Sequence, residues 1–144
     1  MGIIDFFKKL FFSSSLSVKT FPGVVAAKVA GVEKHPNADR LRIIKLDIGD
    51  RIVEPVVCGA FNFGEGDIVA LALPGAQIVQ NIHSETHEPF ILQKAKIRGI
   101  ESQGMICAAF ELVLSKTPGD KPEIMLLKQD VKPGSEFKAD MIKS

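Results

Sequence analysis

The stretch of residues 24–49, VVAAKVAGVEKHPNADRLRIIKLDIG, constrains the fold of this chain more than any other. Two apolar-rich runs, VVAAKVAGVEKH and RLRIIKLDI, flank the short polar segment HPNAD at positions 35–39. Pro36 fixes its own φ angle and favours an extended His35, and the Asn and Asp side chains that follow can hydrogen-bond the backbone. The sequence therefore predicts two strands joined by a turn, with the first strand ending at His35.

The first of these strands alternates in character. Val25, Ala27 and Val29 fall on one face and Lys28 falls on the other, because successive side chains of a strand point to opposite faces. We therefore expect a half-buried strand with one apolar face.

Short apolar runs separated by Gly and Pro continue along the rest of the chain. They predict strands at 52–58, 68–73, 90–99, 105–109 and 123–127 and a turn at 99–104. They also predict a loop or a poorly paired hairpin tip at 79–89 and a brief helical turn at 110–114. Pro55 gives the 52–58 strand an edge position or a bulge, because proline has no N–H to donate to a sheet. Many short strands with little helix between them favour an all-β, closed or nearly closed barrel.

The composition sets the class of protein. With 144 residues, 46% of them hydrophobic, the chain is long enough for one domain with its own core. A net charge of +1 gives no overall positive field, so any nucleic-acid site must come from local clustering of cations. Cys58 and Cys107 lie in apolar strand-like segments, and we expect both to be buried in a reduced, cytoplasmic protein.

The first twelve residues, MGIIDFFKKLFF, are crowded with Ile, Leu and Phe, and a Ser-rich segment follows at 13–17. This pattern predicts an amphipathic helix and a linker over residues 1–20, ahead of a single folded domain at 21–144. The apolar run is too short to span a bilayer, which needs about 20 residues. We expect the helix to pack on the domain or on a partner rather than on a membrane.

Four segments carry a family resemblance: KHPNADRLRIIKLDIG at 34–49, VCGA at 57–60, ALPGA at 72–76 and KAKIRGIESQGMIC at 94–107. In order and spacing they resemble the tRNA-binding domain found near the start of the phenylalanyl-tRNA synthetase beta subunit and in free-standing tRNA-binding proteins. The resemblance covers about residues 22–141. It implies a five-stranded oligonucleotide-binding (OB) Greek-key barrel with short peripheral helices and extra C-terminal strands.

The candidate RNA-binding residues are mainly cations. Lys94, Lys96 and Arg98 alternate on one predicted strand, which would space them about 6 to 7 Å apart, close to the spacing of successive phosphates. A solvated strand face is the alternative interpretation. Lys28 and Lys45 could face a common groove of the central hairpin, which Arg42 need not join. With two polar residues of the 99–104 turn, the full candidate set is Lys28, Arg42, Lys45, Lys94, Lys96, Arg98, Ser102 and Gln103.

The aromatic residues favour recognition of tRNA shape over recognition of its sequence. Tyr and Trp are absent, so Phe alone could stack on bases. Phe61 and Phe63 are either exposed stackers or caps of the core. Ala108 and Phe110 stand where serine is common in related domains, and that serine is implicated in tRNA contact.

Catalytic and metal-binding patterns find little support. His83 and His87 have an i, i+4 spacing, but the segment around them ends in proline and is a poor helix, so we expect no zinc site and no cofactor. We expect a non-catalytic tRNA-binding module, either stand-alone or delivering tRNA to a synthetase, without DNA specificity. The alternative is a protein-interaction or chaperone-like module that binds polypeptide or a synthetase subunit. Free-standing relatives are often homodimers, which makes a homodimer a further expectation.

Overall fold

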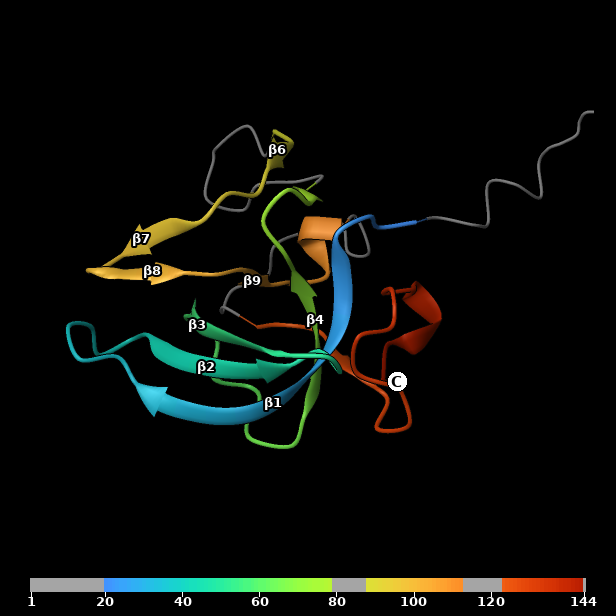
Figure 1. Cartoon of the computed structure of the whole chain (residues 1–144), viewed down its shortest axis with the longest axis horizontal. Coiled ribbons are helices and arrows are strands. Elements are labelled where there is room, and N and C mark those ends of the chain that lie inside the picture. The colour runs from blue at the N-terminus through green and yellow to red at the C-terminus, as the bar shows by residue number, and fades with distance from the viewer. Residues whose placement is uncertain (1–19, 79–87, 113–122, 144) are drawn as a thin grey trace, which may run out of the picture.

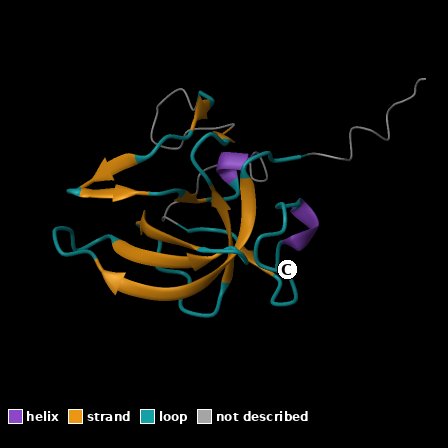
Figure 2. Ribbon diagram, in the orientation of Figure 1, coloured by secondary structure: helices purple, strands orange, loops and turns teal. Residues whose placement is uncertain are grey.

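The computed structural model describes residues 20–78, 88–112 and 123–143. The predicted N-terminal helix and linker, the 79–87 part of the predicted loop and the His83–His87 pair lie outside these residues. Ten strands and two single turns of 3-10 helix are described (Figures 1 and 2). They are β1 (Val24–Lys34), β2 (Arg42–Asp47), β3 (Ile52–Cys58), β4 (Ile68–Ala72), β5 (Gln77–Ile78), β6 (Phe90–Ile91), β7 (Ala95–Ile97), β8 (Ile100–Ser102), β9 (Met105–Ile106), η2 (Phe110–Leu112), β10 (Leu126–Leu127) and η3 (Ala139–Met141).

The described fold is all-β, and every strand pair is antiparallel. The main sheet runs in the order β10-β4-β1-β2-β3, and β9 also pairs with β4. Two separate two-stranded ladders join β5 to β6 and β7 to β8. Within the described residues no ladder joins β3 to the far end of the sheet, so the strand path is open.

The predicted central hairpin is confirmed as β1 and β2, with the turn at 35–41 between them. The 52–58 strand also has the predicted bounds. Pro55 lies in β3, at the end of the strand path, and the β2–β3 register shifts between Ile44 and Leu46. The sequence predicted an edge position or a bulge, and among the described strands β3 has both the end position and an irregular pairing beside Pro55.

The prediction that the first strand is half-buried is correct only for the second half of β1. Along β1, residues from Val24 to Ala27 are buried or half-buried, whereas Lys28 and Ala30 are exposed. The reason is that the sheet packs on both faces: Val24 and Ala26 belong to one core cluster, and Ala27 and Val29 to the other. Along β4 every residue is buried in the same two-sided way. A strand covered on both faces loses its alternation.

The predicted strand at 90–99 is wrong in its extent. The chain forms β6 at 90–91 and β7 at 95–97, with three residues between them in no strand. The predicted turn at 99–104 is also wrong, because residues 100–102 form β8, which pairs with β7. The short strand expected at 105–109 is reduced to β9, and the strand expected at 123–127 to β10. Both buried cysteines and the helical turn at 110–112 are confirmed.

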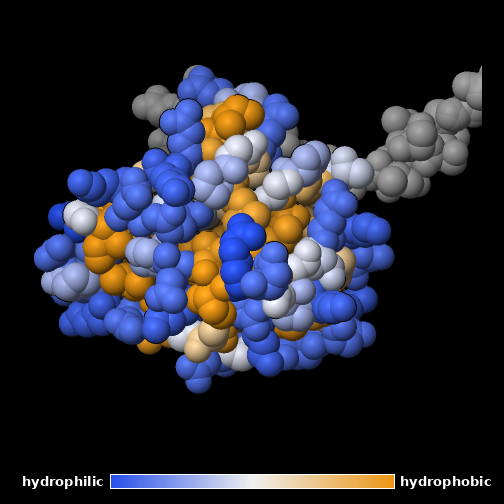
Figure 3. Space-filling model, viewed as in Figure 1, coloured by the Kyte–Doolittle hydropathy of each residue, from blue (hydrophilic) through white to orange (hydrophobic). Residues whose placement is uncertain are grey.

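The surface seen in Figure 3 is mostly hydrophilic, and apolar residues gather mainly near its centre. Of the large hydrophobic side chains described, Ile52, Phe61 and Ile91 are the exposed ones. No helix in the described part of the chain is long and apolar enough to cross a membrane.

Candidate nucleic-acid interface

The β7–β8 hairpin lies above the end of β3 (Figure 1) and is fixed there by the turn that follows β1. Its own turn passes through Arg98 and Gly99, which have positive φ angles of 52° and 91°. Buried His35 bonds through Nε2 to the Ile97 carbonyl oxygen at 3.1 Å, and Asn37 Nδ2 donates to the Arg98 carbonyl oxygen at 3.1 Å. His35 Nδ1 accepts the Asn37 N–H at 3.0 Å, which leaves the proton on Nε2. The turn that joins β1 to β2 thus also fixes the position of the β7–β8 hairpin.

The three cations predicted to alternate on one strand lie on this hairpin in a different arrangement. Lys96 is in β7, opposite Glu101 of β8. Lys94 precedes the strand and Arg98 is in the turn, where the positive φ angle redirects its side chain. All three side chains are exposed. The hairpin therefore gathers the three cations without the regular spacing that one strand would give them.

A groove of about 280 Å³ lies between the start of β3, the residues after β4 and the two residues that flank the hairpin, Lys94 and Gln103. Its lining residues are Arg51, Ile52, Val53, Glu54, Leu73, Pro74, Lys94 and Gln103. Glu54 Oε1 also lies 3.9 Å from Lys45 Nζ. The structure thus brings Lys45, Lys94 and Gln103 into one neighbourhood and adds Arg51, which the sequence analysis missed. Only the packing of the distant hairpin on β3 makes Arg51 a candidate.

Lys28 lies apart from this groove, on the outer face of β1. It is exposed and stands opposite Asp47 of β2. Lys45 is on the same outer face, since it is two residues from Asp47, and its aliphatic stem lies over Gly31. The outer face of the first three strands therefore carries charges of both signs.

Arg42 is held by the protein itself. Its Nη2 donates to the carbonyl oxygens of Ala60 and Phe63, at 3.0 and 2.9 Å. The guanidinium carbon lies 4.7 Å from the centre of the Phe61 ring and 4.6 Å from that of Phe63. Arg42 Nε is buried without a hydrogen-bond partner among the described residues. These contacts turn the guanidinium toward the loop after β3.

Of the two phenylalanines in that loop, one caps the core and the other is exposed, which are the two roles that the sequence left open. Phe63 is buried and belongs to the core, whereas Phe61 is 56% exposed. Asn62, between them, exchanges two hydrogen bonds with the backbone of Ile124, at 3.0 and 3.1 Å. Phe61 is therefore presented to solvent on a loop that is tied down on both sides.

Ser102 and Gln103 connect β8 to β3. Ser102 is buried, and its hydroxyl accepts the Val57 N–H and donates to the Gly104 carbonyl oxygen, both at 2.9 Å. The Gln103 backbone N–H donates to the Pro55 carbonyl oxygen at 2.9 Å. The Gln103 side chain reaches Glu101 at 3.3 Å and lines the groove. Gln103 is thus accessible to a ligand, while both hydrogen-bonding functions of Ser102 are engaged.

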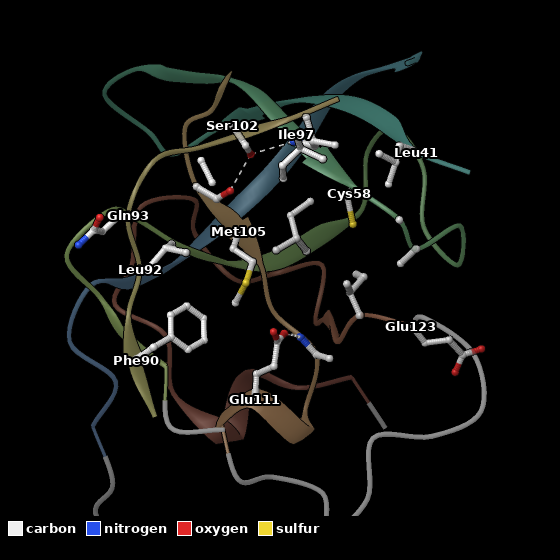
Figure 4. Close-up of a pocket in the computed structure, with 18 residues that line it drawn as sticks. Leu41, Cys58, Phe90, Leu92, Gln93, Ile97, Ser102, Met105, Glu111 and Glu123 are labelled. Atoms are coloured by element: carbon white, nitrogen blue, oxygen red, sulfur yellow. Dashed lines mark hydrogen bonds between the residues drawn. The ribbon is translucent and has the colours of Figure 1, made fainter. Parts of the chain in front are cut away.

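A second cavity, of about 480 Å³, lies between β3, the hairpin and β9 (Figure 4). Glu111 of η2 is buried at one end of it and accepts the Ala108 N–H at 2.8 Å. Burial raises the pKa of Glu111 to about 7, although the hydrogen bond from Ala108 opposes the shift. Burial also raises the pKa of the Cys58 and Cys107 thiols, which keeps them protonated near neutral pH. Within the described residues no group of three or more potential metal ligands occurs.

Comparisons with known proteins agree with the arrangement of the strands. A MetRS-related protein of Pyrococcus horikoshii has a crystal structure that matches 89% of this chain and 98% of its own length, with a TM-score of 0.57 and 17% sequence identity. At that identity the match shows a shared fold.

The sequence relatives are closer. The phenylalanine–tRNA ligase beta subunit of Anaeromyxobacter dehalogenans is 41% identical over 113 residues, and that of Syntrophotalea carbinolica is 42% identical over 111 residues. These matches cover 78% and 77% of this chain but only 13% and 12% of the relatives. Residues 24–136 match the family described as "Putative tRNA binding domain". The chain belongs to that family.

Proposed function

We propose that this chain is a non-catalytic module that binds tRNA through backbone and shape. The observation that carries the proposal is the family membership of residues 24–136. The hairpin that presents Lys94, Lys96 and Arg98 supports it, because cations gathered on a rigid element can follow a phosphate backbone.

The proposed contact surface is the groove and the hairpin beside it. Its members are Lys45, Arg51, Lys94, Lys96, Arg98 and Gln103, with Lys28 as an outlying contact. In this proposal Arg42 and Ser102 act indirectly, by fixing the loop after β3 and the end of β8. The hydrogen bonds of both side chains to the protein backbone favour this indirect role.

The same reasoning extends to the fold and the partners. We infer an OB barrel in which the segment around β8 and β9 closes on β3, supported by the hydrogen bonds from Gln103 to Pro55 and from Val57 to Ser102.

The chain would act in the cytoplasm beside an aminoacyl-tRNA synthetase, as a stand-alone protein or as a part of one. A homodimer would place two copies of the hairpin on one tRNA, and light scattering of the purified chain tests it.

Titration of mixed tRNA into the full-length protein at about 50 and 200 mM salt tests the function. Three to four phosphate contacts predict a loss of affinity of about 40- to 150-fold between these two concentrations. Double-stranded DNA serves as the competitor, and it should displace tRNA poorly. A peptide-binding module would behave in the opposite way, since apolar binding holds or strengthens with salt. Absence of tRNA binding at the lower salt would overturn the proposal.

Charge reversal of Lys94 and Lys96 tests the site. The double variant Lys94→Glu/Lys96→Glu should lower tRNA affinity at least about tenfold at 50 mM salt, because two phosphate contacts become repulsive. The matched control is Lys138→Glu/Lys143→Glu, which makes the same change of net charge in the exposed C-terminal tail, away from the hairpin (Figure 1). Equal losses in the two variants would mean that net charge, and not this surface, governs binding.

A further inference from the structure

The 480 Å³ cavity has the features of a site for one small group. Its volume falls in the range of small-ligand pockets, about 300 to 1,000 Å³. Apolar side chains from distant parts of the chain form the walls, among them Leu41, Phe90, Leu92, Ile97, Met105 and Ile106 (Figure 4). Gln93, Ala95 and Glu123 line the cavity and are exposed, so they mark its opening to solvent.

One buried acid points into this apolar space. Glu111 is 3% exposed, and Figure 4 shows its carboxylate directed from η2 toward Met105. Oε1 accepts the Ala108 N–H at 2.8 Å. One backbone donor offsets only part of the cost of burying a carboxylate in an apolar pocket, so the site favours a ligand that brings further donors to it.

The position of the cavity links it to the proposed RNA surface. Ala95 and Ile97 of β7 form part of its wall, and they alternate with Lys94 and Lys96 along the chain. Because alternate residues of a strand point to opposite faces, Lys96 lies on the other side of β7 from the cavity. A polynucleotide held by these cations would reach the mouth, at exposed Ala95, around the edge of β7 that pairs with no other described strand. Protein sites often read single-stranded RNA by taking an unstacked base into such a pocket and bonding its Watson–Crick edge.

We propose that the cavity binds one unstacked guanine base of the RNA, with the Glu111 carboxylate accepting N1–H and the N2 amino group. This inference rests on the proposed function. Guanine presents two neighbouring donors, which match the two oxygens of a carboxylate. Adenine and cytosine place a ring nitrogen acceptor beside their amino group, and uracil flanks its single N–H with carbonyl oxygens. Phe90 and Met105 supply an aromatic face and a polarisable sulfur for contact with the base.

Because guanine needs an ionised carboxylate, its binding should depend on pH. The titratable groups around Glu111 are Cys58, Cys107 and Glu123. Both thiols stay neutral in the working range because burial raises their pKa, and Glu123 is exposed. With the pKa of Glu111 at about 7, guanine affinity at pH 6.0 should be about five- to tenfold lower than at pH 7.5.

Nucleosides test the pocket without any phosphate. Guanosine, inosine and adenosine are titrated into the full-length protein, and amide chemical shifts report binding. We expect guanosine to shift residues around Met105 and Glu111 and inosine, which lacks the N2 amino group, to bind at least about tenfold more weakly. Equal binding of guanosine and inosine, or no shift with guanosine at millimolar concentration, would overturn the proposal.

The variant Glu111→Gln completes the test. Its amide oxygen can still accept the Ala108 N–H, while its NH₂ opposes the donors of guanine, so guanosine binding and its pH dependence should both be lost. The wild-type pH series tests the same point without relying on the variant. In Glu111→Gln, tRNA binding should weaken but keep its dependence on salt, because the phosphate contacts remain. Wild type that binds tRNA without preferring guanosine refutes the pocket alone, whereas failure to bind tRNA at low salt refutes the proposed function.

Discussion

At the scale of single residues, Arg42 shows how a surface-type side chain can become structural. Replacing it with alanine removes two charge-assisted hydrogen bonds and the contacts with two rings. We expect Arg42→Ala to lower the free energy of unfolding by about 2 to 4 kcal/mol. Urea unfolding followed by circular dichroism measures it, because the chain has no Trp or Tyr to report by fluorescence.

The neighbouring exposed arginine provides the control for this prediction. Arg40→Ala removes the same charge from the same hairpin, and its effect should stay within about 0.5 kcal/mol. If Arg42→Ala were equally mild, the contacts with Ala60 and Phe63 would contribute nothing to stability.

Glu111 should make stability depend on pH. Burial raises its pKa from the ordinary value of 4.5 to about 7 in the folded chain, so the folded state holds more protons between these two values. The carboxyl therefore contributes stability below pH 4.5 that is lost as pH rises to about 7, by about 2 to 4 kcal/mol in all. The difference in unfolding free energy between wild type and Glu111→Gln, measured from pH 4.5 to 7.5, should fall with pH and then level off. A difference that does not vary with pH would contradict the prediction.

At the scale of elements, the β7–β8 hairpin should depend on the turn after β1. Asn37→Ala removes the bond to the Arg98 carbonyl oxygen, and we expect faster hydrogen exchange in residues 95–102 with little change in β1 or β4. Asn62→Ala is the matched control, since that side chain holds Ile124 instead. It should speed exchange near 123–125 and leave the hairpin protected. Uniform effects of the two variants would mean that neither asparagine acts locally.

The elements also show how far the sequence can be interpreted without a structure. Pro36 and the polar residues after it act on their own backbone, so the central hairpin was predictable, and Pro55 likewise indicated the irregular edge. The partners of Arg42 lie 18 and 21 residues away, and alternation alone did not show that its side chain turns inward. The break between β6 and β7, the role of Arg51 and the burial of Glu111 all follow from packing between distant segments. Local pattern carries no information about such contacts.

At the scale of the whole molecule, the net charge is near zero, so tRNA binding must depend on how the charged side chains are arranged on the surface. Glu54 lies in the groove with Arg51 and Lys94 and is 3.9 Å from Lys45. It should therefore oppose the approach of a phosphate to the surrounding cations. We expect Glu54→Gln to strengthen tRNA binding about two- to fivefold at 50 mM salt and to have a smaller effect at 200 mM, because salt screens exposed charges.

The control for Glu54→Gln makes the same charge change elsewhere. Glu136→Gln removes one exposed negative charge from the C-terminal tail, outside the residues that line the groove. If net charge governed tRNA binding, the two variants would gain equally. If the groove is the contact surface, Glu54→Gln should increase tRNA affinity clearly more than Glu136→Gln does. This increase should disappear when the charges of Lys94 and Lys96 are also reversed, because the phosphate would then no longer be drawn into the groove. A gain that survives that reversal would place the tRNA on another face of the protein.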